Sequence, residues 1–186
     1  MNSKEIMKKN QSALSRAKEV LKIEAQSILR LVNNIDKNFS RAVDLISRCK
    51  GRVIITGIGK SGLIGKKIVA TLTSTGTQAL FLHPAEGIHG DLGIVTKKDV
   101  LLAISNSGET RELVPIISSV RSIGTPIIIF TGKKDSTLAR SSDIVIDVSV
   151  EKEACPFGLT PTSSSTAALA MGDALAIALI DKKQFR

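Results

Sequence analysis

The chain has 186 residues and a net charge of +9, and its shares of apolar (42%) and charged (23%) residues are ordinary. These values indicate one folded domain, with room for a helical arm, and exclude wholesale disorder. Two cysteines exclude a disulfide framework, and five Phe without any Trp or Tyr disfavour a base-stacking surface.

The first 38 residues are predicted to form a helical arm. Through residues 11–36, apolar side chains recur at spacings of three and four, which places them on one face of a helix. Such an arm needs a surface to cover that face, either its own domain or a second subunit. The residues of the face are Leu14, Ala17, Leu21, Ala25, Ile28, Val32 and Ile35.

The charge and hydropathy of the chain limit the kinds of binding partner that we expect. Residues 1–67 hold 15 basic and 5 acidic side chains, yet no recognition motif accompanies them, so we expect no nucleic-acid partner. The first eleven residues lack the apolar region of a signal peptide. No run reaches the roughly 18 apolar residues of a membrane span. We therefore expect a cytoplasmic protein that does not bind a membrane.

After the arm, short apolar strands alternate with helices. Continuous Val/Ile/Leu strands of this kind indicate a parallel sheet covered on both faces, so the fold class is α/β, a three-layer αβα sandwich with five strands. The expected strands are 52–56, 79–82, 100–104, 126–130 and 144–148, and the expected helices are 40–49, 63–72, 112–123, 136–141 and 161–182. Right-handed crossovers then bring the loops after the strands to one edge of the sheet.

The loop after the first strand, Gly57–Gly62, matches the dinucleotide fingerprint G-x-G-x-x-G. However, the second strand ends in Leu82-His83 and lacks the acidic ribose ligand, and Ile54 stands where a Walker A loop needs glycine. What remains is an anion site at a helix N-terminus beside Lys60, or a plain tight turn.

The loop after the third strand is rich in hydroxyls. Ser105, Ser107 and Thr110 surround a glycine just before a helix. Hydroxyls and backbone amides there can donate to a phosphomonoester, helped by the positive end of the helix. The alternative is an ordinary N-cap, which needs only one hydroxyl.

Both histidines of the chain, His83 and His89, follow the second strand. They could bind a metal together with Asp91 or Glu86, act in acid/base chemistry or sugar binding, or belong to a plain polar loop.

Glu153 follows the last strand and could be a carboxylate base. The hydroxyls of residues 162–166 make either a second anion site or an over-supplied helix cap.

These motifs resemble the SIS (sugar isomerase) family, in particular its arabinose 5-phosphate isomerase branch. The resemblance covers about residues 40–182 and rests on GIGKSGLIGKK, STGT, HPAEGIHGDLG, ISNSGET and KEACPFGLTPTSSSTAALAMGDALA. It implies a flavodoxin-like SIS domain over residues 39–186. It also implies reversible conversion of D-ribulose 5-phosphate to D-arabinose 5-phosphate for Kdo and lipopolysaccharide synthesis, and a homotetramer with shared sites.

The resemblance also assigns residues. It implies a catalytic set of Lys60, His89, Glu112 and Glu153. It places the phosphate at Ser61, Ser105, Ser107 and Thr110, with Gly76 and Thr77 nearby. No cofactor is expected to be required, and His83 matches the position of an inhibitory zinc.

The chemistry of an aldose–ketose isomerase needs a base near two adjacent carbons. A carboxylate whose pKa is raised by burial would serve. The sequence does not decide between Glu112 and Glu153 as this base, and we slightly prefer Glu112.

Two departures from the family pattern concern the end of the chain. No pair of CBS domains follows, and the sequence stops at Phe185-Arg186, before the HPGG segment with its further histidine. The alternatives are therefore a non-catalytic sugar-phosphate-binding domain or an isomerase of another sugar phosphate. A DNA-binding regulator is disfavoured, because no helix-turn-helix precedes the sheet.

Overall fold

The computed structural model describes residues 12–185. The predicted absence of a signal peptide concerns residues 1–11, which lie outside this range, as does residue 186.

Five parallel strands form a sheet, as the apolar runs predicted. They are β1 (Val53–Thr56), β2 (Ala79–Phe81), β3 (Val100–Ile104), β4 (Ile127–Thr131) and β5 (Ile144–Asp147). Their order across the sheet is β2-β1-β3-β4-β5. β1, β3 and β4 are buried along their whole length, which is why they read as continuous apolar runs rather than as alternating ones.

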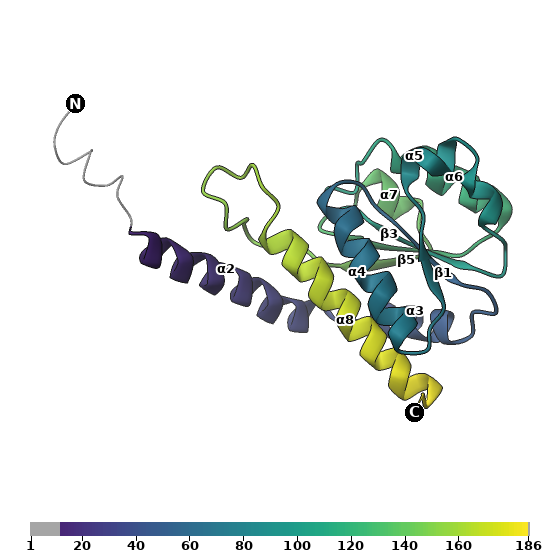
Figure 1. Ribbon diagram of the computed structural model, residues 1–186, viewed down its shortest axis with the longest axis horizontal. Helices are drawn as coiled ribbons and strands as arrows, with labels where there is room; N and C mark the ends of the chain where they lie inside the picture. Colours follow the sequence, from purple (N-terminus) through teal and green to yellow (C-terminus); the bar gives the residue numbers. More distant parts are fainter. Residues whose placement is uncertain (1–11, 186) are drawn as a thin grey trace.

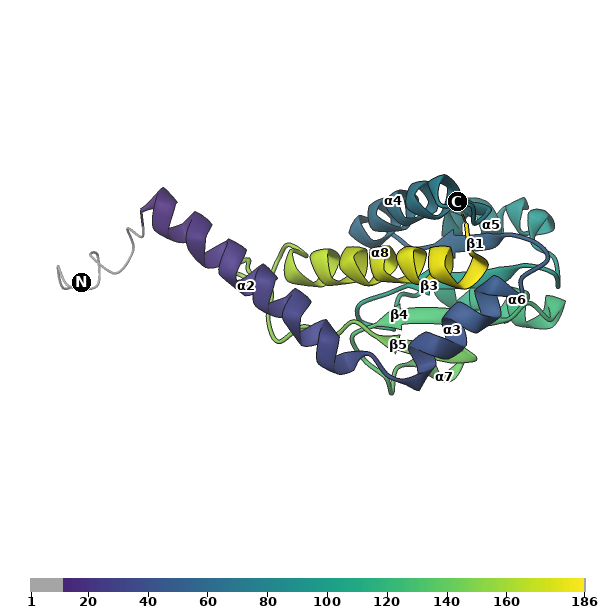
Figure 2. The ribbon, with the colours of Figure 1, turned by 90° about the horizontal axis from the view of Figure 1, so that it is seen from below.

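Helices cover both faces of the sheet, which confirms the three-layer sandwich (Figures 1 and 2). On one face lie α3 (Lys37–Ser47), α4 (Lys60–Ser74) and α8 (Ser163–Lys183). On the other lie α5 (Pro84–Ile88), α6 (Leu113–Ile123) and α7 (Thr137–Arg140). Two separate apolar cores result, because successive strand side chains point to opposite faces: Ile55 joins the first core and Ile54 the second.

Helix α8 is the central helix of its layer. An 18-residue window of this 21-residue helix has a mean hydropathy of 1.4, enough by length and composition alone for a membrane span. The sequence search for an uninterrupted apolar run did not identify it, because Asp173 interrupts the run. Half of that apolar window is buried inside the protein, where α8 packs against α2 (Ala13–Asn34), α3 and α4. The apolar composition of α8 is therefore explained by its place in the core.

Helix α2 (Ala13–Asn34) extends beyond the sandwich (Figures 1 and 2). The apolar face predicted from its spacing does not meet the domain: Leu14, Leu21 and Val32 are 76%, 68% and 67% exposed. A different face, with Ser27 and Leu31, is the buried one. The domain thus covers one side of α2, and no part of residues 12–185 covers the predicted apolar face.

The segment after β2 was expected to be a loop, but it holds α5 and a 3₁₀ turn, η1 (Asp91–Ile94). Pro84 occupies the first turn of α5, and His83 caps it, with Nδ1 accepting a hydrogen bond from the Ala85 amide. These are ordinary helix-start signals. Both elements are too short to show a helical period in the sequence.

Candidate functional site

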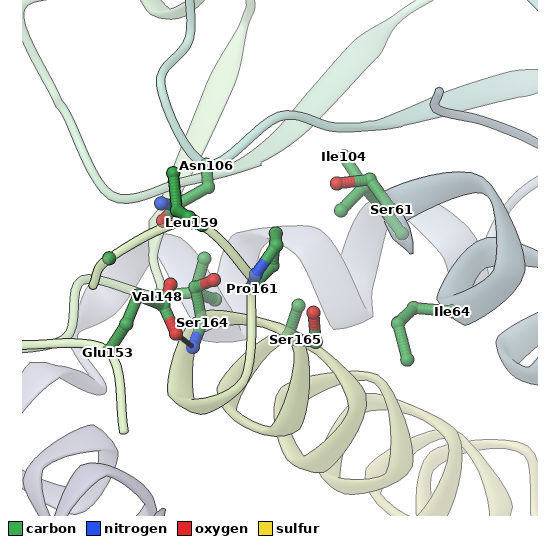
Figure 3. A pocket seen from close by; sticks show the side chains of 12 residues that line it. Ser61, Ile64, Ile104, Asn106, Val148, Glu153, Leu159, Pro161, Ser164 and Ser165 are labelled. Atoms are coloured by element: carbon green, nitrogen blue, oxygen red, sulfur yellow. Dashed lines mark hydrogen bonds between the residues drawn. The ribbon is translucent and has the colours of Figure 1, made fainter. Parts of the chain in front are cut away.

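A cavity of about 270 Å³ opens at the edge where the strands end. Its walls come from the ends of β3 and β5, the first turns of α4 and α8, and the loop between β5 and α8 (Figure 3). This is the edge that the parallel sheet predicted. Its polar lining consists of Ser61, Asn106, Glu153, Ser164 and Ser165, and its apolar lining includes Ile64, Ile104, Val148, Leu159 and Pro161.

Glu153 is the carboxylate of this cavity. Its Oε2 accepts hydrogen bonds from the backbone N of Thr162 (2.7 Å), the Oγ1 of Thr162 (2.9 Å) and the backbone N of Ser164 (3.3 Å). The carboxylate thus caps the N-terminus of α8, where the partial positive charge of the helix favours an anion. Thr162 is the N-cap residue, but its side chain makes no capping bond to the helix.

Because of these contacts, the pKa of Glu153 differs from the one expected from the sequence. Burial pushes the pKa of Glu153 up, but the hydrogen bonds from Ser164 and Thr162 outweigh it and hold the pKa below its usual range. A catalytic carboxylate with a raised pKa was expected, and Glu153 is the opposite. It is a carboxylate that stays ionised at neutral pH and can therefore only accept a proton.

The hydroxyl-rich loop after β3 divides into an inward and an outward part. Ser105 is buried, and its Oγ lies 2.7 Å from the Oγ1 of Thr110 and accepts from the Gly108 amide at 3.0 Å. Ser107 is exposed, and its Oγ accepts from the Glu109 amide at 3.2 Å, so its own proton is available to a ligand. Asn106, between them, reaches the cavity.

The glycine-rich loop opens α4, with Lys60 as the first helical residue and Ser61 as the second. Gly59 takes φ +57°, a conformation that favours glycine. Ser61 lines the cavity with Glu153, whereas Lys60 lines a neighbouring hollow of about 460 Å³ that also contains Lys66, Phe81 and His83. The lysine and the serine of this motif therefore face two adjoining spaces.

The remaining catalytic candidates lie at the surface of the same side. His89 ends α5 and Glu112 precedes α6, and both are exposed and outside the lining of the cavity. Within residues 12–185 no three His, Cys, Asp or Glu side chains gather as a metal site would require. The described chain therefore does not gather His83 and His89 with Asp91 or Glu86 into one group of ligands.

Gly76 and Thr77 lie before β2, at the opposite edge of the sheet. Thr77 is buried there, and its Oγ1 accepts a hydrogen bond from the Nζ of Lys183 at 2.9 Å. Together with Cys49 and Lys50 they line a separate hollow. One chain therefore does not bring this pair to the cavity that holds Glu153.

Of the residues singled out from the sequence, Ser61 and Glu153 share the cavity itself. Sequence reasoning did not single out Asn106, although it stands between two hydroxyl residues that were named. Ser164 and Ser165 entered the sequence argument only as part of the hydroxyl run that opens α8. An amide or hydroxyl directly after a buried strand or at a helix start is the signal that identifies all three.

The chain matches the family model described as the SIS domain over residues 45–178. It is 50% identical over 177 residues to the arabinose 5-phosphate isomerase KdsD of Francisella tularensis, covering 94% of this chain and 54% of that protein. The chain spans about half the length of the curated relatives that it matches.

Solved structures agree with the fold. A putative sugar-phosphate isomerase of Listeria monocytogenes superposes with a TM-score of 0.91 at 31% identity, covering 95% of each chain. The E. coli CFT073 protein c3406, in complex with arabinose 5-phosphate, superposes with a TM-score of 0.89 at 37% identity, covering 100% of this chain and 95% of the other.

Proposed function

The chain belongs to the SIS domain family, and from that premise we propose that it is an aldose–ketose isomerase that interconverts D-ribulose 5-phosphate and D-arabinose 5-phosphate. The observation that carries the proposal is the ionised Glu153 carboxylate in a cavity lined by hydroxyl and amide groups. The identity to arabinose 5-phosphate isomerases and the arabinose 5-phosphate complex of a related structure support this substrate.

The reaction moves one proton between C1 and C2 of the sugar through a cis-enediol. A base removes the proton from C1 of the ketose, and the same proton or one from solvent is returned at C2, while the hydroxyl proton moves from O1 to O2. In this proposal Glu153 acts as the base, which its lowered pKa and its position in the cavity lining support. The hydroxyls and amides nearby can stabilise the charge that develops on the sugar oxygens.

The remaining roles follow the family pattern. Lys60 stabilises the enediolate, and His89 and Glu112 serve the proton transfers at oxygen. Ser61, Ser105, Ser107 and Thr110 bind the phosphate at the starts of α4 and α6. No metal or cofactor is required for such a proton transfer, and zinc at His83 would be inhibitory.

The active assembly in this proposal is a homotetramer in the cytoplasm, and its product enters Kdo and lipopolysaccharide synthesis. The exposed apolar face of α2 supports association, since large apolar patches on soluble proteins mark interaction sites. Gly76 and Thr77 would reach a substrate only at a site shared with a neighbouring subunit. The arm, residues 1–38, and the SIS domain, residues 39–186, then have separate tasks, association and catalysis.

Proton NMR of this chain with D-ribulose 5-phosphate in heavy water tests the proposal. We expect arabinose 5-phosphate that carries deuterium at C2, formed equally well in the presence of a chelator. Broadened sugar-phosphate signals without product would identify a non-catalytic binding domain. Faster turnover of a competing hexulose or heptose phosphate would identify an isomerase of another sugar phosphate.

A further inference from the structure

Thr162 departs from the usual behaviour of a helix N-cap. A threonine in this position normally accepts a hydrogen bond from an amide of the first helical turn. Here the Oγ1 of Thr162 accepts instead from the backbone N of Ala154, at 2.8 Å, and lies 2.9 Å from the Oε2 of Glu153. Because an ionised carboxylate can only accept, the single hydroxyl proton of Thr162 is donated to Glu153.

The two bonds fix the hydroxyl and the carboxylate together. Ala154 and Thr162 are eight residues apart, so the hydroxyl joins the two ends of the loop that borders the cavity. The backbone N of Thr162 adds a second bond to Glu153 at 2.7 Å, and the backbone N of Ser164 adds a third. These three bonds end on Oε2, and the side chain of Ser164 is a further donor to the carboxylate.

We propose that Thr162 is a positioning residue, whose hydroxyl holds the Glu153 carboxylate in one orientation at the cavity wall. This inference rests on the proposed function for its consequence, since a fixed orientation matters when Glu153 must reach a substrate proton. Catalysis loses rate steeply when a reacting group is misplaced. Thr162 acts through Glu153, and Glu153 remains the residue that reacts.

The test compares Thr162→Val, which keeps the shape and removes the hydroxyl, with Thr162→Ser, which keeps the hydroxyl. In the valine variant we expect kcat to fall at least about tenfold with KM little changed. The acidic limb of the pH–rate profile should move upward by about one pH unit, because Glu153 loses a donor that favours its ionised form. The serine variant should restore both properties.

The titration of Glu153 gives a readout that does not depend on turnover. Carbon-13 NMR of glutamate-labelled protein can follow its carboxyl signal, assigned by its loss in Glu153→Gln. We expect the pKa of Glu153 to rise in Thr162→Val and to return in Thr162→Ser. Thr166→Val is the matched control, since that hydroxyl bonds to Glu24 on α2, at 3.1 Å, and not to Glu153.

Neighbouring charges stay constant through this comparison. Glu151 and Lys152 lie on the same loop, Glu24 on α2 and Lys60 at the start of α4, and none is substituted. An unchanged Glu153 titration and pH profile in Thr162→Val would overturn the inference. If valine prevents folding, Thr162→Ala replaces it in the same measurements.

The two proposals fail separately. If the wild-type chain converts no ribulose 5-phosphate, the proposed function fails, and the titration still decides whether Thr162 holds Glu153. If the wild type is active and Thr162→Val matches it in rate, profile and titration, only the positioning role is wrong.

Discussion

The carboxylate of Asp99 accepts a hydrogen bond from the backbone N of Arg52, 2.7 Å away, and so ties the start of β3 to the start of β1. Its other oxygen accepts from the backbone N and the Oγ1 of Thr96, at 2.7 and 2.8 Å. Gly51 leaves room for this arrangement, because a Cβ there would lie 2.3 Å from the Oδ1 of Asp99. A buried carboxylate thus joins two neighbouring strands at the edge opposite the cavity.

We expect Asp99→Asn to lower the free energy of unfolding by about 2–3 kcal/mol at pH 7. The asparagine NH₂ group would face a backbone donor, and one buried N–H would lose its acceptor. Urea unfolding followed by circular dichroism measures the change. A loss below about 0.5 kcal/mol would contradict the structural role of these bonds.

The Asp99 carboxylate also makes the free energy of unfolding depend on pH, with a direction that follows from its pKa. Burial raises the pKa of Asp99, but the hydrogen bonds from Arg52 and Thr96 prevail and hold the pKa below its ordinary value of 3.8. The stabilisation is therefore present above the unfolded pKa, near pH 4, and is lost as the pH falls through the folded pKa. The difference in free energy of unfolding between the wild type and Asp99→Asn should therefore become smaller as the pH falls from 5 to about 3. An equal difference at both pH values would argue against this linkage.

Gly172→Ala should destabilise the contact between α8 and α4. An added Cβ would lie 2.4 and 2.5 Å from two atoms of Ile68, a fully buried side chain. Overpacking of this kind costs about 1–3 kcal/mol, more than the helix propensity gained. Gly93→Ala is the control, since nothing lies within 4 Å of its Cβ. Ile68→Val in combination with Gly172→Ala should recover part of the loss; strict additivity would show that the two positions do not clash.

Ser107→Ala should mainly affect ligand binding, whereas Ser105→Ala should mainly affect the stability of the fold. Loss of the exposed Ser107 hydroxyl should weaken arabinose 5-phosphate binding about five- to tenfold, with little change in stability. Loss of the buried Ser105 hydroxyl should lower stability by about 1–2 kcal/mol, because it removes the bonds of this hydroxyl to Thr110 Oγ1 and to the Gly108 amide, which keeps the Ser105 carbonyl oxygen as an acceptor. Calorimetry of binding and thermal unfolding measure both. Unchanged affinity in Ser107→Ala would remove that residue from the phosphate site.

Glu153→Gln and Glu112→Gln distinguish the two candidate bases. We expect Glu153→Gln to lower kcat about a hundredfold or more, as loss of an acid/base group does, while substrate still binds. Glu112→Gln should lower kcat less, because Glu112 lies outside the lining of the cavity. Steady-state kinetics on both variants measures this. The reverse order of effects would assign the base to Glu112.

If the chain assembles as the proposed homotetramer through α2, Leu21→Glu should shift it to smaller species. Leu21 is 68% exposed within one chain, so the substitution should leave the folded subunit intact while placing a charge in the proposed interface. Lys22→Glu, on the neighbouring exposed position, is the charge control. Sedimentation velocity measures the distribution, and an unchanged tetramer in Leu21→Glu would exclude this face from the contact.

Much of the fold is readable from local sequence. Val100–Ile104 was predicted as a strand with the bounds that the structure has. A continuous run of five apolar residues after a turn is typical of a buried strand. Because the strands are parallel, the loops after them lie at one edge of the sheet, where Ser61 and Glu153 line the same cavity. The family motifs lie in the loops that follow these strands, so the resemblance and the periodicity point to the same edge.

Tertiary structure decided what depends on contacts between distant residues. The buried face of α2 is set by its packing on α8, which no spacing within α2 reveals. Thr77 bonds to Lys183, 106 residues later, at the edge away from the cavity. The pKa of Glu153 is low because Thr162 and Ser164 approach it across a loop. Periodicity and composition describe a residue's neighbours along the chain, whereas burial, hydrogen bonding and charge at a site are set by neighbours in space.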